Sequence, residues 1–418
     1  MNKKRLIENI LSLYLLQIVN YILPLITLPY LVRVLGPEKF GLIAFTQAFI
    51  QYFNILTDYG FNLSATREIA IYKENKDKVS EILSSVMFIK ICLLLLSFVI
   101  MSIVVFSFEK FRQDWLIYYL TFGMVVGQVL FPIWFFQGME KMKYITFLNI
   151  LAKLVFTVAI FIFIHKASDY IYVPLINSLG SIVVGVLALW MVSKYFDVRF
   201  IKPTIQSIKY HLKEGWYIFV STIAISIYTV STTFILGIFT NNTVVGYYAA
   251  ADKIIQAVKG LMSPITQAIY PYINKKVAIS KDEGLIFIRK ITKFTAIFTL
   301  VLSITIFTFS EEIVGLVLGP NYKNSIPVLM ILSIHPFLIG LSNIFGIQTM
   351  LSFNRKKAFQ NILLSASILN VVLSLILVPS FQHIGSAISV TLVEAFVTLA
   401  MFLYLQKTGI KILEFKHV

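Results

Sequence analysis

The chain has 418 residues, of which 58% are hydrophobic and only 13% are charged. Soluble globular proteins carry about 25% charged residues, so this composition excludes a water-soluble protein. The net charge of +16 is interpreted as a sign of membrane orientation and not of nucleic-acid binding, because the basic residues lie between apolar segments. The single cysteine, Cys92, excludes a disulfide framework and a cysteine-rich metal site, and no cofactor is expected.

Hydropathy predicts about twelve transmembrane helices, because a helix needs roughly 20 apolar residues to cross the hydrocarbon. The first one follows Lys3, Lys4 and Arg5 and lacks a cleavage signal, so we expect it to remain as a span. In chain order, the predicted spans are 10–31, 40–60, 82–106, 115–136, 144–165, 170–192, 215–238, 245–271, 291–309, 326–350, 359–379 and 384–405. The expected fold is therefore an all-α membrane protein.

The spans form two groups of six. We expect an N-terminal lobe over 1–195, a cytoplasmic connection over 196–214 and a C-terminal lobe over 215–418. Of the 36 Lys and Arg residues, five lie inside spans and six lie in loops that are external if the N-terminus is cytoplasmic. The other 25 lie on the internal side, so the positive-inside rule predicts that both termini are cytoplasmic.

A shift of 205 residues aligns the two halves, as expected for a duplicated six-helix unit in parallel orientation. The identities at this shift pair Thr27 with Thr232, Gly41 with Gly246, Ala44 with Ala249 and Gln51 with Gln256. Polar stripes also fall at corresponding positions of the two halves. We therefore expect a duplicated architecture with polar faces in equivalent places.

These stripes predict a water-filled cavity. The polar residues expected to line it are Gln17, Asn20, Gln47, Gln51, Asn54 and Gln256, each on one helical face of its span. For stripes of Ser and Thr alone, hydrogen bonding between helices is the preferred interpretation. For the face that bears Asp252, Gln256 and Lys259 together, a cavity is preferred.

Ionisable residues within the spans are candidate site residues, because each costs roughly 2.5–3.5 kcal/mol at mid-bilayer and needs a partner or water. The candidate cations for substrate binding are Lys90, Lys153, Lys253 and Lys259, and the candidate proton-coupling acids are Asp58, Asp252 and Glu394. Arg33 and Arg67 are candidate charges at the cavity mouths. Asp252 has a second interpretation, as the neutralising partner of Lys253 or Lys259.

Several motifs together resemble those of Wzx-type O-antigen flippases. They are LGPEKFG at 35–41, DYGFN at 58–62, ATREIA at 65–70, FPIWFFQGMEKM at 131–142, GYY at 246–248 and AADKI at 250–254. The resemblance covers nearly the whole chain. It implies the fold of the related multidrug antiporters, in which two six-helix lobes form a V around a central cavity.

The resemblance also implies a function. The expected substrate is an oligosaccharide repeat unit on undecaprenyl diphosphate, moved from the cytoplasmic to the periplasmic leaflet of a bacterial inner membrane by alternating access. The implied partners are membrane lipids, an O-antigen polymerase and a chain-length regulator.

Two other functions fit the sequence less well. A multidrug or organic-cation antiporter of the same fold would require acids to dominate the cavity. An O-antigen polymerase would require a large external loop, whereas the longest here is about 16 residues, at 310–325. The five histidines are scattered, and His335, which precedes Pro336, is interpreted as a packing residue at a helix kink. No enzymatic activity is expected.

Overall fold

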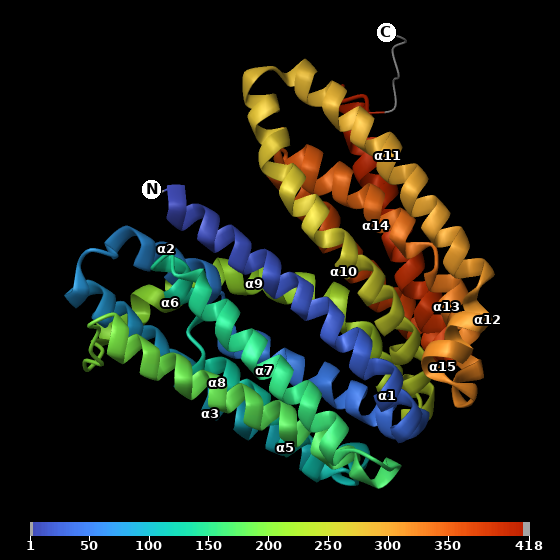
Figure 1. Cartoon of the computed structure of the whole chain (residues 1–418), viewed down its shortest axis with the longest axis horizontal. Coiled ribbons are helices and arrows are strands. Elements are labelled where there is room, and N and C mark those ends of the chain that lie inside the picture. Colours follow the sequence, from blue (N-terminus) through green and yellow to red (C-terminus); the bar gives the residue numbers. More distant parts are fainter. Residues whose placement is uncertain (1–2, 413–418) are drawn as a thin grey trace. The chain divides into compact units, whose positions relative to one another are not determined.

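The computed structural model describes the backbone of residues 3–412 and, with few exceptions, their side chains (Figure 1). The exceptions are the side chains of 3–22, 24, 25, 224, 225, 227–229, 261, 263–265, 267 and 268. Over the described residues the chain is helical and contains no strand. The longer helices are α1 (Lys3–Asp58), α2 (Phe61–Tyr72), α3 (Lys76–Ser107), α5 (Trp115–Leu130), α7 (Met142–Phe163), α8 (Tyr172–Tyr195), α9 (Ile205–Phe239), α10 (Asn242–Ile279), α11 (Lys281–Thr308) and α15 (Lys356–Lys407).

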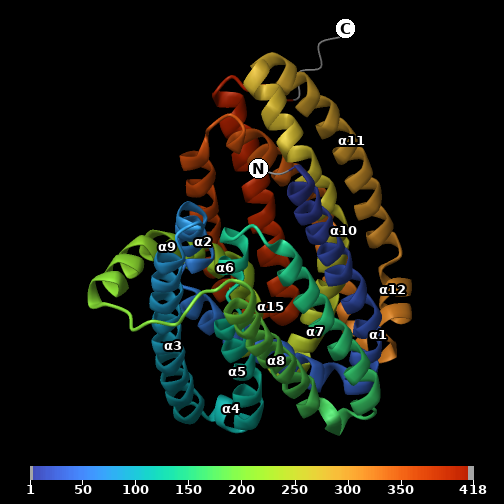
Figure 2. The same cartoon turned by 60° about the vertical axis from the view of Figure 1, so that its left-hand side comes forward.

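Shorter helical elements connect or extend these. They are α4 (Glu109–Arg112), α6 (Ile133–Gly138), η1 (Ala167–Ile171), α12 (Ser310–Ile313), η2 (Val314–Leu318), η3 (Pro320–Ser325), α13 (Ile326–Leu332), α14 (His335–Asn343) and η4 (Ile344–Leu351). Figure 2 shows α4 at the turn that joins α3 to α5.

Each of the twelve predicted spans falls mainly on helical residues, with breaks at 131–132 inside the span 115–136 and at 333–334 inside the span 326–350. Two of them lie in α1, on either side of the non-helical Gly36 (φ 70°), and two lie in α15, on either side of Gln382 (φ 51°). Eight helical stretches among the described residues are long and apolar enough to cross a membrane. The prediction of an all-α membrane protein is confirmed.

Side-chain caps fix the starts of three long helices. The side chain of Asn75 accepts a hydrogen bond from the backbone N–H of Lys78, and the side chain of Asn241 accepts one from the backbone N–H of Val244. Ser280 caps α11 through the N–H of Glu283. These bonds satisfy backbone donors that a helix start otherwise leaves without partners.

The chain divides into two compact units. Unit 1 consists of Met1–Leu35 and Ile43–Ile223, and unit 2 consists of Gly36–Leu42 and Ala224–Val418. The predicted lobes ended at 195 and began at 215, so the division here lies further along the chain, inside α9. In addition, a short segment of α1 packs with the second unit and not with the first.

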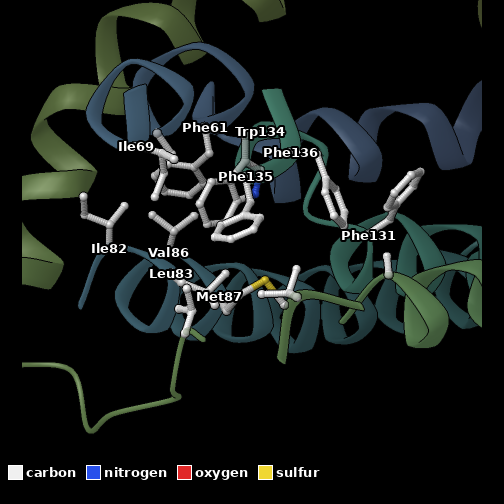
Figure 3. Close-up of a cluster of buried hydrophobic side chains, with 14 of the residues drawn as sticks. Phe61, Ile69, Ile82, Leu83, Val86, Met87, Phe131, Trp134, Phe135 and Phe136 are labelled. Carbon is white, nitrogen blue, oxygen red and sulfur yellow. The ribbon is translucent and has the colours of Figure 1, made fainter. Parts of the chain in front are cut away.

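Three of the sequence motifs supply buried side chains to the core of unit 1. Trp134, Phe135 and Phe136 have no exposed surface and belong to one cluster with Phe61 and Ile69 of α2 and Val86 of α3 (Figure 3). The hydroxyl of Thr66 also donates to the backbone carbonyl of Trp134 over 3.2 Å.

Gly138 follows these aromatic residues. A Cβ added to Gly138 would lie only 2.5 Å from the Cβ of Ile69. The residues FPIWFFQG and ATREIA therefore hold α6 against α2 through packing, and this explains their presence without any substrate contact.

Small residues allow close helix packing elsewhere in unit 1. α5 and α8 run side by side (Figure 1), and Gly127 of α5 lies against the backbone of Ser181 of α8. Gly185 of α8 lies in turn against the backbone carbonyl of Gly127. Such contacts are the usual basis of helix association in lipid, where apolar side chains gain little by leaving the hydrocarbon.

In unit 2, the segment Gly36–Leu42 crosses the start of α10 through two glycines. A Cβ on Gly41 would stand 1.8 Å from the carbonyl oxygen of Asn242, and a Cβ on Gly246 would stand 1.9 Å from that of Pro37. Residues 37 and 41 align with 242 and 246 at the 205-residue shift. The crossing is therefore symmetric between the two sequence repeats, and each repeat supplies one glycine.

We expect Gly41→Ala to destabilise the protein by at least the 1–3 kcal/mol typical of overpacking, because the new methyl group would overlap backbone that cannot rotate away. The measurement is the thermal unfolding midpoint of the purified protein in detergent. Gly180→Ala is the matched control, since nothing lies within 4 Å of its Cβ position. Equal unfolding midpoints for the two variants would contradict the close backbone contact at Gly41.

The first turns of α9 bury a polar face in unit 1. His211 is only 4% exposed, and one turn earlier the hydroxyl of Ser207 lies 2.9 Å from that of Ser85 in α3. Burial lowers the pKa of His211 to about 4, although the nearby Glu81 carboxylate opposes the shift. His211 is therefore neutral in the folded protein at pH 7.

Since the unfolded chain protonates His211 near pH 6.5, stability is fully present above that pH and is lost as the pH falls toward 4. The loss should amount to roughly 2–3 kcal/mol. The test compares the thermal midpoints of wild type and His211→Gln at pH 7 and pH 4.5. The wild type should lose markedly more stability than the variant, and parallel losses would contradict this assignment.

Candidate functional site

A polar pocket lies within unit 1. Its volume is about 340 Å³, and its lining residues come from α1, α5, α7 and α8. The polar ones are Thr27, Asn149, Lys153, Thr157, Asn177 and Ser181. Of the described residues that line it, only Lys153 is charged. The face of α7 that carries Asn149, Lys153 and Thr157 therefore lines a hollow.

The hydroxyls of this pocket are anchored to their own helices. Ser181 donates to the carbonyl of Asn177 over 2.8 Å, and Thr27 donates to that of Leu23 over 3.2 Å. The amide of Asn149 donates to the carbonyl of Ile145 over 2.9 Å. Each side-chain oxygen still keeps acceptor capacity, so the pocket can solvate a polar group while the ammonium of Lys153 supplies a positive charge.

A second polar pocket lies within unit 2 and has a volume of about 430 Å³. It is lined from α9, α10, α14, η4 and α15. Its ionisable lining residues are Asp252, Lys259, His335 and Glu394, and its other polar ones include Thr232, Thr233, Gln256, Ser342 and Asn343. The sequence thus identified three of the ionisable residues, and the structure brings them into one hollow.

Hydrogen bonds hold the side chains of this second pocket. Ser342 donates to Oε1 of Glu394 over 2.8 Å, and the amide of Gln256 donates to the carboxylate of Asp252. Nε2 of His335 lies 3.0 Å from the hydroxyl of Thr391. The carboxylates are therefore oriented by neutral donors.

Lys90 and Asp58 form a different arrangement. The side chain of Lys90 is 2% exposed, and its Nζ lies 3.9 Å from Oδ1 of Asp58, which is 14% exposed. Neither residue lines either pocket. They form an ion pair within unit 1, beside the aromatic core formed by α2, α3 and α6.

The remaining candidates lie elsewhere. Lys253, Arg33 and Arg67 are exposed and line neither pocket. The same holds for Gln47, Gln51 and Asn54, of which Asn54 donates to Gln51 over 3.1 Å. The side chains of Gln17 and Asn20 lie outside the described residues.

Sequence reasoning missed several pocket residues. His335, interpreted as a packing residue, is 4% exposed and also lines the unit 2 pocket, which the sequence did not indicate. Asn177 and Ser181 lie one turn apart in α8 and form a short polar face, which is the signal that could have found them. Among the described residues, no group of three or more His, Cys, Asp or Glu residues could hold a metal ion.

Residues 6–277 match the family described as polysaccharide biosynthesis protein. A protein of Escherichia coli K12 named "Putative O-antigen transporter" is 37% identical over 97% of this chain and 98% of its own length. The chain belongs to this family. The resemblance to Wzx-type flippases is confirmed, and the chain is a membrane transporter rather than an enzyme.

Other relatives agree with this membership. A protein of Shigella dysenteriae that carries the same name is 29% identical over 94% of this chain and 98% of its own length. A "Probable low-salt glycan biosynthesis flippase" of Haloferax volcanii is 23% identical over 91% of the chain and 79% of its own length.

Solved structures show the fold. The lipid II flippase MurJ in an inward closed conformation superposes with a TM-score of 0.76, covering 96% of this chain and 87% of MurJ at 14% identity. A multidrug resistance transporter of the MATE family in an inward-facing conformation gives 0.69, covering 93% of this chain and 94% of the transporter, also at 14% identity. The predicted MATE-like fold is confirmed.

We expect Lys90→Met to destabilise the protein by about 3–5 kcal/mol, because it leaves the carboxylate of Asp58 buried without its counter-charge. Asp58→Asn should be harmful for the same reason, since it leaves the ammonium alone. The double variant should regain much of the loss. A thermodynamic cycle from unfolding midpoints measures this coupling, and simple additivity of the two losses would contradict the ion pair.

Proposed function

We propose that this protein moves undecaprenyl-diphosphate-linked oligosaccharide repeat units from the cytoplasmic to the periplasmic leaflet of a bacterial inner membrane. The observation that carries the proposal is the 37% identity with a named O-antigen transporter over 97% of the chain. The pockets add support, because each compact unit has a polar hollow that contains a lysine among apolar helices.

In this proposal, the unit 1 pocket receives the diphosphate. An ammonium forms strong charge-assisted hydrogen bonds with phosphate oxygens, and the described lining there has no carboxylate to oppose it. Asn149, Asn177 and Ser181 can solvate the remaining oxygens. The polyprenyl chain stays in lipid, and alternating access between the two lobes carries the headgroup across.

The membrane potential can drive the step. Moving one charge through 100 mV is worth about 2.3 kcal/mol, so a dianion leaving a negative interior would gain ~4–5 kcal/mol if it crossed the full field. We place both termini in the cytoplasm, because the internal segments then hold 25 of the Lys and Arg residues against six outside. An O-antigen polymerase and a chain-length regulator are the partners that would use the product.

One observation favours a second function, the export of an organic cation. The unit 2 pocket holds two carboxylates, Asp252 and Glu394, against the single ammonium of Lys259. Taken alone, this lining suits a cation. The flippase remains preferred because the relatives that cover almost the whole chain carry transporter and flippase names tied to glycans.

Lys90 has another role in this account. Since its ammonium is buried beside Asp58 and lines neither pocket, we assign it to the stability of unit 1 and not to substrate contact. Lys253 is exposed, and we assign it no substrate contact either.

Deletion of the gene should leave lipid-linked repeat units on the cytoplasmic side while their synthesis continues. Complementation with Lys153→Gln should reduce translocation by about tenfold or more, because a hydrogen bond to a charged group is worth about 1.5–3 kcal/mol. The measurement is the leaflet distribution of the lipid-linked glycan. Lys293→Gln, at an exposed position of α11, is the matched control and should complement fully.

Two results would contradict the proposal. Repeat units that reach the periplasm unpolymerised in the deletion strain would point to a polymerase. Unchanged glycan distribution together with increased sensitivity to cationic drugs would favour the antiporter.

A further inference from the structure

His335 offers a buried polar atom with no hydrogen-bond partner among the described residues. Its side chain is 4% exposed and lines the unit 2 pocket, and its Nε2 lies 3.0 Å from the hydroxyl of Thr391. Its Nδ1 is buried and has no partner in the described part of the chain. Leaving such a group unsatisfied costs about 1–3 kcal/mol, so a turn of the imidazole that brings either nitrogen to a ligand in the pocket would recover that free energy.

The chemistry around His335 is mixed. Asp252 and Glu394 offer carboxylate oxygens, Lys259 offers N–H donors, and Gln256, Ser342 and Asn343 offer groups of both kinds. A ligand that fits this lining must both donate and accept hydrogen bonds at several points. A hydroxyl does both, and a neutral imidazole nitrogen can meet it in either tautomer.

A phosphate group does not fit this lining. Two carboxylates face the same hollow as one ammonium, so an anion would meet net repulsion in a medium where charges interact strongly. The pocket of unit 1 has the opposite character, with Lys153 and no carboxylate among its described lining residues. A neutral group rich in hydroxyls therefore fits the lining of the unit 2 pocket better than a phosphate does.

The apolar part of the unit 2 pocket suits a sugar ring as well. Tyr248, Phe359 and Met401 are among its lining residues, and such side chains can cover the C–H face of a ring while polar groups take its hydroxyls. The volume of about 430 Å³ lies in the range of small-molecule sites, roughly 300–1,000 Å³.

We propose that the unit 2 pocket is a sugar subsite that binds a ring of the lipid-linked saccharide through His335, Glu394 and Asp252. This inference rests on the proposed function and concerns the pocket of unit 2, where sugar hydroxyls meet His335. His335 and its neighbours then determine which saccharide is carried.

The test uses the full-length protein in lipid nanodiscs and two probes. One is undecaprenyl diphosphate, and the other is the lipid-linked saccharide that accumulates in the deletion strain. Titration gives a dissociation constant for each probe with wild type, His335→Phe and Glu394→Gln. Both variants should bind the saccharide probe about tenfold more weakly, because one hydrogen bond is lost and a buried partner is left unsatisfied. Their affinity for undecaprenyl diphosphate should stay within about twofold.

Two further variants keep the comparison interpretable. His383→Phe changes another histidine of unit 2 that does not line the pocket, and it should bind both probes as wild type does. If His335→Phe fails to purify as a folded protein, Ser342→Ala replaces it, because it removes the donor to Glu394 with less change in volume.

The outcomes are separable. Equal weakening for both probes, or no weakening for either, would overturn the sugar subsite. So would variants that bind the saccharide normally but lose the pH dependence of transport, since the pocket would then carry protons. If the wild type binds neither probe, the proposed function itself fails. If it binds both with equal affinity, only the sugar subsite fails.

Discussion

The absence of water in the hydrocarbon is the constraint on which the rest of this structure depends. Backbone groups there must be paired within the chain, and over the described residues the regular structure is helical, with no strand. Ionised side chains need a counter-charge or water. Lys90 has a counter-charge in Asp58, whereas Lys153 and Lys259 line hollows. We therefore propose a structural role for Lys90 and a place in the polar pockets for Lys153 and Lys259.

The polar pockets of the two units contain different charged side chains. The pocket of unit 1 has one ammonium among amides and hydroxyls, and the pocket of unit 2 has two carboxylates, one ammonium and a buried imidazole. The crossing of Gly41 and Gly246 is symmetric at the 205-residue shift. The pocket side chains of the two units differ, whereas this glycine contact is matched in both halves.

Sequence alone predicted the fold well, because hydropathy and helical length depend on local composition. It also selected Lys90, Lys153 and Lys259 as ionisable residues within predicted spans. It could not give their partners, since Asp58 lies 32 positions before Lys90 and its approach depends on tertiary packing. His335 was missed because a histidine before a proline looks like any kink residue until the neighbouring helices surround it. The motif at 131–138 proved to be a packing element.

The most direct test reconstitutes the purified protein in liposomes that carry a lipid-linked saccharide in both leaflets. A membrane-impermeant enzyme that modifies the glycan then reports the fraction that reaches the outer leaflet. The account predicts that the protein makes nearly the whole pool accessible, and that Lys153→Gln slows this. Accessibility no higher than in protein-free liposomes, with efflux of an organic cation instead, would contradict it.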